Sequence, residues 1–541
     1  MKHALLLLIL LSSLAINAFA SEVDSTYSAE TIATVTPAVA DDSIAVAADG
    51  KHKYAHLADS IWFNPVTGRR MHLQRLGGVD TLVVTRPDAL KAAAKTLGIN
   101  ALILSYDHFV QDREWARVTS SVIGEHFRQK PVFDNDSFSG NQFSHPYHGG
   151  MFFNAARNEG LSYGVSLLYP LLGSASWEWL CETNPPSVND LLSTGIGGAV
   201  IGEVSNRVSD IFYDDSTWGL NRIFRELFAG FLNPVRGVHR LLSGEMWRRS
   251  ASRGKHIAPQ PYSFEVGVGY RAMNELSYQC SSEHAAPLQH LSSPYLDFSF
   301  DYGERFNPSH RSKAFDLFSV SLLANLSSDH PSVGELEISG RLADRQFEHS
   351  HDWRLDVGFY QNLKYVDHYS KEEQHPHGFS IINEAVSFGG GLYAEHQTGK
   401  ICFLNDCMLS AVVFGGTTAD YYPSRRYNYA SGLSLRNRTQ FYINQRATIG
   451  NRFYGARLFS LHGYKPADVD QMIADGIEPN CWGDQGNYYI MTDNAFLQYN
   501  IWKNVRINID YQIYLRRANY KYSPDVKARS EEWKIGLIYS I

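Results

Sequence analysis

Residues 262–541 show a hydrophobic period of two, the pattern of β-strands with one apolar and one polar face. The clearest run places Val505, Ile507, Ile509, Tyr511, Ile513 and Leu515 on one face and Arg506, Asn508, Asp510, Gln512, Tyr514 and Arg516 on the other. Similar alternation covers residues 295–302, 335–342, 354–360, 433–443 and 533–541. Together with weaker segments, these runs predict about twelve strands.

The length and polarity of these runs favour a membrane barrel over a soluble sandwich. Strands of soluble proteins average about 5–6 residues, whereas a transmembrane strand needs about 9–11, and runs such as 433–443 reach the longer class. A sandwich core could not bury unpaired Arg, Asp, Asn and Gln side chains, but a barrel faces them into a wet lumen and turns its apolar face to lipid. A secreted sandwich or propeller is the alternative.

Before the strands, residues 85–250 carry helical spacing of apolar positions. The pattern begins at Asp88, which stands where an N-cap belongs. It recurs over residues 149–158, 162–182, 188–212, 220–231 and 234–247. The uncharged stretch 161–177 is interrupted by Pro170 and Gly173, so it predicts a helix buried against protein or lying at a membrane surface, not a membrane span. The predicted fold class is therefore α+β: a helical region followed by an antiparallel transmembrane β-barrel of about 12 strands.

The first residues predict export. Lys2 precedes the apolar run 4–11, and Ala18-Phe19-Ala20 forms a cleavage site, so residues 1–20 are expected to be a cleaved signal peptide. Residues 21–50 lack any period and predict a flexible leader, and residues 51–84 form a short extended segment. The final amphipathic strand, ending at Ile541, resembles the strand by which outer-membrane barrels are recognised for insertion. The outer membrane is the expected location, with its lipid as a partner.

Composition narrows the partners and the redox chemistry. The 541 residues are 44% hydrophobic and 19% charged, with a formal charge of −7 and no run of Lys or Arg, so a nucleic-acid partner lacks an electrostatic basis. Five Cys residues exclude a disulfide-dense scaffold. Cys402 and Cys407 flank Asn405-Asp406, which predicts a hairpin turn that the two thiols either staple or leave unpaired.

Residues 133–247 hold the densest set of motifs. They include Asp134-Asn135-Asp136, Asn141-Gln142-Phe143-Ser144-His145-Pro146-Tyr147, Asn154-Ala155-Ala156-Arg157, Trp177-Glu178, Pro186-Ser187-Val188-Asn189-Asp190, Gly202-Glu203 and Arg207. In these motifs the chain resembles the uncharacterised bacterial family catalogued as domain of unknown function 3943, over about residues 85–250. The resemblance implies an exported, outer-membrane protein of Gram-negative bacteria, and it implies no activity, substrate or catalytic residue.

The polar side chains of this stretch form the candidate site. They are His145, Asn154, Arg157, Glu178, Glu182, Asn189, Asp190, Glu203 and Arg207. Glu178/Glu182 and Glu203/Arg207 are spaced four apart, which places each pair on one helix face. One hypothesis is that these groups converge into a site with displaced pKa values and possible chemistry. The favoured hypothesis is a structural network of ion pairs and helix caps, and Asp134 to Asp136 are expected to form a solvated turn.

No recognised catalytic motif, metal spacing or cofactor fingerprint occurs, so neither a metal nor a cofactor is predicted. Three functions stay open. The first is a structural or solute-transport barrel with helices at the periplasmic mouth or in the lumen, whose lumen charges select small or anionic solutes: Arg354, Asp356, Arg436, Arg438, Arg506, Asp510 and Arg516. The second is a periplasm-facing binding or assembly module that contacts an envelope protein. The third is an enzyme acting on lipid or envelope polymer, with His145, Glu178, Glu182 and Asp190 as acid or base groups.

Overall fold

The computed structural model of the chain describes residues 71–76, 79–84, 87–249, 261–279, 288, 290–306, 313–327, 331–348, 353–368 and 381–541. The predicted signal peptide, the leader and residues 51–70 lie outside the described residues.

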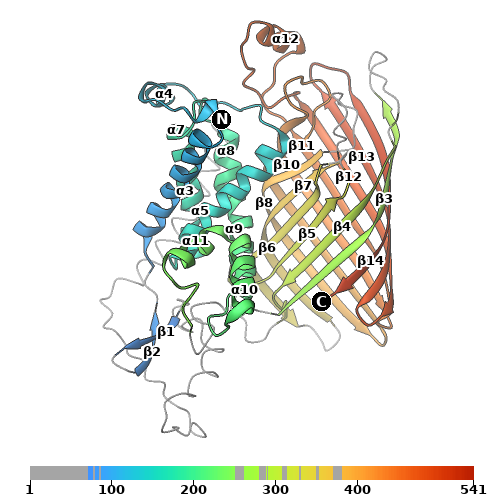
Figure 1. The fold of residues 1–541 in the computed structure, drawn as a ribbon. Coiled ribbons are helices and arrows are strands. Elements are labelled where there is room, and N and C mark those ends of the chain that lie inside the picture. The colour runs from blue at the N-terminus through green and yellow to red at the C-terminus, as the bar shows by residue number, and fades with distance from the viewer. Residues whose placement is uncertain are drawn as a thin grey trace. The chain divides into compact units, whose positions relative to one another are not determined.

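Twelve antiparallel strands close into a barrel, because the last strand pairs with the first (Figure 1). In chain order they are β3 Tyr262–Gln279, β4 His290–Tyr302, β5 Phe318–Asn325, β6 Val333–Glu348, β7 Trp353–Asp367, β8 Ile381–Thr398, β9 Ile401–Thr418, β10 Tyr427–Ile443, β11 Ala447–Phe459, β12 Gly486–Trp502, β13 Val505–Tyr520 and β14 Val526–Ser540. The predicted fold class, a helical region followed by an antiparallel barrel, is confirmed.

The two faces of the wall follow the predicted alternation. On β13, Asn508, Asp510 and Arg516 are buried in the lumen, whereas Ile507 of the opposite face is exposed. The register sets Ile507 beside Leu537 of β14, and Leu537 is likewise exposed. An exposed apolar outer wall around a charged lumen is the arrangement of a transmembrane barrel of the outer-membrane type.

The two ends of the barrel differ. At the terminus end β3 begins, β14 ends, and the turns 399–400, 444–446 and 503–504 are short, whereas the connection between β4 and β5 is longer. At the loop end lie the connections 419–426 and 460–485, the second of which carries helix α12 (Pro466–Ala474). Short periplasmic turns and longer extracellular loops are the rule for such barrels, so the loop end corresponds to the extracellular side.

Near the loop end, apolar side chains fill the lumen. The core consists of lumen-facing residues of strands β7 to β14: Val366, Ile382, Val412, Ala430, Tyr454, Ala456, Leu458, Tyr488, Ile490, Ala518 and Val526. Leu458, Tyr488, Ala518 and Val526 are each 0% exposed. These side chains pack against one another and narrow the lumen in this layer.

The region before the barrel is helical, as predicted. A two-stranded sheet (β1 Met71–Leu76, β2 Val79–Val84) precedes α3 Ala89–Phe109, a 3-10 turn Glu114–Ala116, α4 Ser120–His126, a π-helical turn Gly140–Ser144, α5 His145–Asn158, α6 Tyr163–Ser166, α7 Leu168–Leu180, α8 Val188–Leu192, a second π-helical turn Ser193–Gly197, α9 Gly198–Phe212, α10 Gly219–Leu232 and α11 Pro234–Leu242. Asp88 caps α3 as predicted, accepting a hydrogen bond from Lys91 N at 2.9 Å. Among the described residues, none of these helices combines the length and apolarity needed to cross a bilayer.

The chain divides into two compact units, and the division passes through the helical region. The first, the helical unit, comprises Met1–Arg117, Gly149–Trp177 and Gly202–Pro259. The second, the barrel unit, comprises Val118–His148, Glu178–Ile201 and Gln260–Ile541. Part of the sequence that reads as helical domain therefore packs with the barrel strands.

In the helical unit, α10 and α11 approach each other through glycine. A Cβ built on Gly237 would lie 2.7 Å from Cα of Gly230, closer than real contacts allow. The buried faces of these two helices are charged, with Arg222, Glu226 and Arg240 all buried. Their exposed faces are apolar, the reverse of the pattern of a soluble surface helix.

Cys402 and Cys407 do not flank a turn. Both lie inside β9, and Asn405 and Asp406 continue the strand. Cys402 pairs in register with lumen-facing Tyr442, and Cys407 pairs with Asn437 of the outer face, so the two thiols point to opposite sides of the wall and are free. The predicted hairpin at 405–406 is wrong because the strand runs from Ile401 to Thr418 without interruption.

The Gly230–Gly237 contact makes a first prediction. Gly237→Ala should destabilise the helical unit by about 1–3 kcal/mol, because the added methyl group overlaps backbone that cannot move aside. Gly98→Ala in α3 is the matched control. Nothing lies within 4 Å of its added Cβ, so it should be neutral or stabilising by up to about 1 kcal/mol. Denaturant unfolding monitored by helical circular dichroism measures both, and equal stability of the two variants would contradict the prediction.

Candidate functional site

Part of the helical sequence covers the outer wall of the barrel, within the barrel unit. On the outward face of β7, Val357 and Phe359 are exposed, but Gln361, Leu363 and Tyr365 are at most 2% exposed. Phe138 stacks on Tyr365 at a centroid distance of 4.8 Å, and Gln361 Nε2 donates to the carbonyl of Ile196 at 3.1 Å. A Cβ on Gly197 would lie 2.7 Å from the carbonyl oxygen of Ala385 in β8, which explains glycine at this position.

The covering segments therefore lie outside the lumen and towards the loop end. Their backbones pair with each other: Val132 N donates to Pro186 O at 2.9 Å, and Val188 N donates to Val132 O at 2.8 Å. For these segments the predicted placements, in the lumen or at the periplasmic mouth, are wrong. The physical reason is that outward-facing aromatic and amide side chains of β7 to β10 supply the partners, and alternation alone does not distinguish such a covered patch from a lipid-facing one.

A buried polar network, here called the clamp, ties these segments to the barrel. Asp134 accepts hydrogen bonds from Asn141 Nδ2 at 2.7 Å and from Asn189 Nδ2 at 3.0 Å. The same Asn141 nitrogen lies 2.8 Å from the hydroxyl oxygens of both Tyr427 and Tyr429, on the outward face of β10. Asn141 and Asn189 are 0% exposed, so each lost hydrogen bond would leave a buried polar group unsatisfied.

Two loop residues complete the clamp. Arg425 donates to the carbonyl oxygens of Asp134 at 2.6 Å and of Cys481 at 2.8 Å, and its guanidinium stacks 4.1 Å over the Tyr429 ring. Phe133 N donates to Asn480 Oδ1 at 2.8 Å. The clamp thus joins sequence positions nearly 350 residues apart.

Two carboxyl pairs within the clamp share protons. Burial raises the pKa of Asp134, but hydrogen bonds from Asp190, Asn141 and Asn189 outweigh burial and lower it below its usual value. For Asp190, burial and the neighbouring Asp134 charge raise the pKa well above its usual value. The two carboxyl groups share a hydrogen bond, and these opposite shifts favour the proton on Asp190 over Asp134.

Glu178 and Glu182 form the second pair. The sequence predicted that both lie on one face of a single helix, but α7 ends at Leu180, so Glu182 lies beyond the helix. Burial raises the pKa of Glu178 to about 7, opposed by the hydrogen bond that Ser187 N donates to it at 2.7 Å. Burial and the Glu178 charge raise the pKa of Glu182 to about 10. Glu182 is accordingly protonated at neutral pH.

His145 joins the clamp as a neutral base. Its Nε2 lies 3.5 Å from Asp190 Oδ1, and burial lowers the pKa of His145. The hydrogen-bond partner of the other ring nitrogen is Thr194, whose Oγ1 lies 3.4 Å from His145 Nδ1.

The remaining predicted residues belong to the helical unit and form a separate network. Glu203, which is fully buried, accepts from Arg157 Nε at 2.7 Å and from Arg207 Nε at 2.8 Å. Burial raises the pKa of Glu203, but the two arginines outweigh burial and hold it below its usual value. Asn154 Nδ2 donates to Ser205 Oγ at 2.8 Å. The predicted i,i+4 pair Glu203/Arg207 is confirmed.

The structure thus assembles four of the predicted ionisable groups, His145, Glu178, Glu182 and Asp190, together with Asn189. Sequence reasoning missed the centre of the clamp: Asp134, expected in a solvated turn, is its main acceptor. It also missed Asn141 and the barrel partners Tyr427, Tyr429 and Arg425. Asn141 stood in a quoted motif and could have been included, but the tyrosines follow the ordinary strand alternation and carry no separate signal.

None of the three principal cavities of the described residues is lined by a member of the clamp. Within those residues, no group of three or more His, Cys, Asp or Glu is placed to hold a metal ion. The clamp is therefore a polar network built of hydrogen bonds between the covering segments and the barrel.

The open space lies in the barrel lumen, where a cavity of about 820 Å³ extends from the terminus end. Its ionisable lining is balanced in sign: Glu265, Asp297, Asp301, Glu335, Glu337, Asp406 and Asp510 against Arg305, Lys364, Arg436, Arg438, Arg452, Arg506 and Lys534. The apolar lumen core lies towards the loop end from this cavity, because Tyr454 belongs to both linings.

Most of the lumen charges are paired. Arg436 lies 2.6 Å from Glu384, and Asp356 lies 2.8 Å from Arg305 and 3.1 Å from Arg341. Of the other predicted lumen residues, Arg516 binds Asp420 outside the cavity lining, Arg506 contacts Glu265, and Arg354 pairs with Glu395 and is partly exposed.

Arg438 and Arg452 depart from this pairing. They are direct register partners on β10 and β11, so two like charges stand side by side on the lumen face. Arg452 has Asp510 at 3.5 Å, but Arg438 has no carboxylate within 4.0 Å among the described residues. Asp406, the register partner of Arg438 on β9, instead lies 3.7 Å from Arg305. Like charges directly opposite in a sheet are destabilising, and the neighbouring acids Asp301, Asp406 and Asp510 offset part of this repulsion.

Comparison with known proteins supports the resemblance seen in the sequence. The family model described as "Domain of unknown function (DUF3943)" matches residues 130–235. No curated protein matches the chain.

Solved structures similar to the chain are outer-membrane barrels. They include the COG4313 outer membrane channel from Pseudomonas putida F1 (8% identity, 52% of this chain and 96% of that chain covered, TM-score 0.27) and a Pseudomonas aeruginosa FadL homologue (8%, 52% and 91%, TM-score 0.23). They also include the outer membrane protease OmpT from Escherichia coli (9%, 52% and 97%, TM-score 0.20). At these identities the likeness concerns the fold alone, and channels and a protease share it.

The Glu178–Glu182 pair makes a second prediction. Because Glu182 keeps its proton from pH 4.5 to about 10 in the folded protein but ionises above its ordinary pKa when unfolded, the folded state binds more protons in this range. The free energy of unfolding should therefore fall as pH rises through it.

Glu182→Gln should remove that part of the fall. At pH 9 the free energy of unfolding of the variant should exceed that of the wild type by at least about 1.4 kcal/mol, the equivalent of one pKa unit. At pH 4 the two free energies should be equal. Denaturant titrations at several pH values measure this, with exposed Glu114→Gln as the control. A parallel pH dependence of wild type and Glu182→Gln would show that Glu182 ionises normally.

Proposed function

We propose that this protein is an outer-membrane barrel of solute-transport type that binds a small anionic solute in its lumen and is closed at rest. The observation that carries the proposal is the side-by-side pair Arg438 and Arg452 on the wall of the lumen cavity. A carboxylate or phosphate between the two guanidinium groups would relieve their repulsion and accept hydrogen bonds from both.

Local charge, and not net charge, would give the selectivity. The cavity lining is balanced overall, so a solute gains little from long-range attraction. The neighbouring acids Asp297 and Asp301 would hold a solute that also carries hydroxyl or amine groups. A volume of about 820 Å³ suits a small-molecule ligand, because such sites typically span about 300–1,000 Å³.

Closure follows from the apolar core of the lumen. An ion that crosses this layer would lose its hydration shell without gaining polar partners, which is prohibitive in an apolar medium. Transport would therefore require the core side chains, Tyr488 and Leu458 among them, to move apart.

The clamp, in this proposal, is structural. It fixes residues 131–148 and 187–197 on the barrel wall, which favours packing over catalysis for His145, Glu178, Glu182 and Asp190. An assembly role remains the second candidate, since these segments and the loop 460–485 join into one surface through Asn480. An envelope protein partner stays a prediction, and crosslinking from this surface in intact cells tests it.

Succinate, a small dianion, probes the lumen site. Saturating succinate should raise the unfolding temperature of the wild type, because about 2.7 kcal/mol of stabilisation accompanies a ligand at 100 times its Kd. The double variant Arg438→Gln/Arg452→Gln should lose this response. Arg446→Gln, which removes an exposed arginine from the turn between the same two strands, should keep it. With sodium chloride at equal ionic strength as the reference, an equal response of all three proteins would contradict the lumen site.

Planar-bilayer recording tests closure. The purified wild type should show no steady conductance above background, since the apolar core blocks the lumen. Tyr488→Ala/Leu458→Ala, which removes two large side chains from that layer, should produce measurable conductance. A wild type that conducts continuously would refute the closed state.

A further inference from the structure

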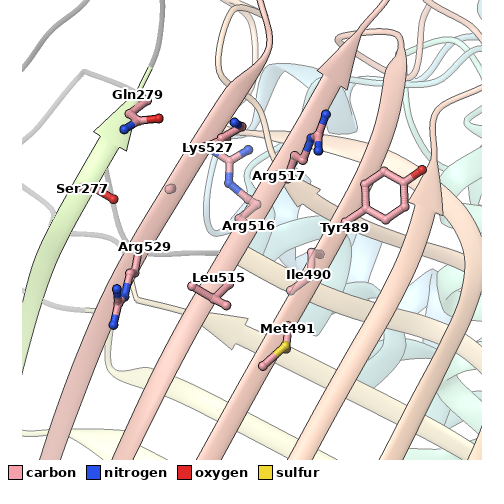
Figure 2. Close-up of a pocket in the computed structure, with 11 residues that line it drawn as sticks. Ser277, Gln279, Tyr489, Ile490, Met491, Leu515, Arg516, Arg517, Lys527 and Arg529 are labelled. Atoms are coloured by element: carbon pink, nitrogen blue, oxygen red, sulfur yellow. The ribbon is translucent and has the colours of Figure 1, made fainter.

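A row of basic side chains crosses the outer face of the barrel near the loop end. Arg457 of β11, Tyr489 of β12, Arg517 of β13 and Lys527 of β14 are successive register partners, so they stand in one line across four strands. One step below Lys527 on the same face of β14 is Arg529, whose register partner is Leu515. Figure 2 shows Tyr489, Arg517, Lys527 and Arg529 around one hollow of the wall, which measures about 350 Å³.

These cations face outwards, and none of them forms an ion pair with a described carboxylate. Arg457, Arg517, Lys527 and Arg529 are all exposed, whereas the alternating residues Leu458, Ala518 and Val526 are fully buried in the lumen core. Among the described residues, no carboxylate lies within 4.0 Å of any of the four. Arg457 lies over the Tyr489 ring at 5.7 Å, and Arg517 Nε donates to Asn519 Oδ1 at 2.9 Å, contacts that orient the two guanidinium groups.

Below the row the same face is mainly apolar. Met491, Leu515 and Ile513 follow on β12 and β13, and Trp533, Ile535 and Leu537 follow on β14. The register partners of Ile513, Asp493 and Glu531, are acidic. Four cations without an ion-pair partner among the described residues, above a mainly apolar wall, match an amphiphile, with phosphate at the level of the cations and acyl chains along the wall. A soluble anion would gain nothing from the apolar part.

We propose that this row is a binding site for a lipid whose headgroup carries phosphate. Arginine suits the role because its planar guanidinium binds phosphate oxygens in pairs. The loop end corresponds to the extracellular side, so the lipid would belong to the outer leaflet.

Native mass spectrometry of the full chain with dioctanoyl phosphatidic acid tests the proposal. The wild type should retain the lipid, and Arg517→Gln/Lys527→Gln/Arg529→Gln should bind it roughly 100-fold more weakly. The control Lys400→Gln/Arg446→Gln/Lys503→Gln removes three exposed cations from terminus-end turns and should bind it like the wild type.

Three results would overturn the proposal. They are equal retention by all three proteins, an equal loss in the control, and displacement of the lipid by inorganic phosphate at the same concentration, which would assign the row to a soluble anion. Because the lumen arginines are intact in both triple variants, their succinate response separates this site from the lumen site.

A different observation carries a second inference, about the helical unit. The charged side chains of α10 and α11 are inside: Arg240 binds Glu226 at 2.7 Å and Asp215 at 2.6 Å, and its guanidinium stacks 4.6 Å over Tyr213. Outside stand apolar residues, among them Phe224, Leu227 and Phe231, which are 69%, 63% and 77% exposed. The helix α3 repeats the inversion, with Thr96 and Asn100 buried and Leu102 and Phe109 exposed.

We infer that this apolar face lies among the acyl chains of the bilayer. In water the charged groups would be more stable at the surface and the aromatic groups inside. In hydrocarbon the order reverses, and polar groups must satisfy one another internally, as the buried ion pairs do here. Since none of the described helices is long and apolar enough to span, the helices would enter the membrane without crossing it.

Photocrosslinking distinguishes the possible environments of this face. p-Benzoylphenylalanine replaces Phe224 or Phe231, both conservative exchanges, and Glu114 serves as an exposed polar control in the same unit. After irradiation in outer-membrane vesicles, phospholipid adducts should form at 224 and 231 and stay at background at 114. Adducts to protein, or no adducts at 224 and 231, would refute the inference.

Discussion

The pairing of β14 with β3 is the contact on which the other features depend. It closes the sheet, so each of the twelve strands has a paired neighbour on both sides. Closure also defines an inside and an outside. Because side chains alternate along a strand, Asp510 and Arg516 then face the lumen, and Ile509 and Leu515 face outwards.

On each side of the wall, the kind of side chain then changes along the barrel axis. Inside, charged side chains line the cavity towards the terminus end, while an apolar core fills the lumen towards the loop end. Outside, most positions are apolar, but Tyr427 and Tyr429 receive polar segments, and Arg517 and Lys527 stand without counter-charges. These local exceptions to the two-sided pattern carry the functional proposals, because each places a polar group where the surrounding face would leave it unsatisfied.

Polar burial has a different consequence in each unit. In the clamp, hydrogen bonds between amide and carboxyl groups join segments that are far apart in the sequence. Removal of one partner would leave the other buried polar groups without a hydrogen bond. In the helical unit, full ion pairs such as Arg157–Glu203 and Arg240–Glu226 occupy the interior. Such pairs are weak sources of stability against apolar packing, but they fix geometry where the exterior is apolar.

The sequence by itself determined the strands, their faces, the helices and the cap at Asp88, because hydrophobic period and capping act between residues a few positions apart. It also identified Asn189, Asp190, Glu178 and His145 as a polar group. Only the tertiary structure decided that Asp134 is their centre, that Tyr427 and Tyr429 are their partners, and that Arg438 stands beside Arg452. These facts depend on register between strands and on contacts across up to about 350 positions. A linear pattern shows which face a side chain takes, and only the closed barrel fixes what stands opposite it.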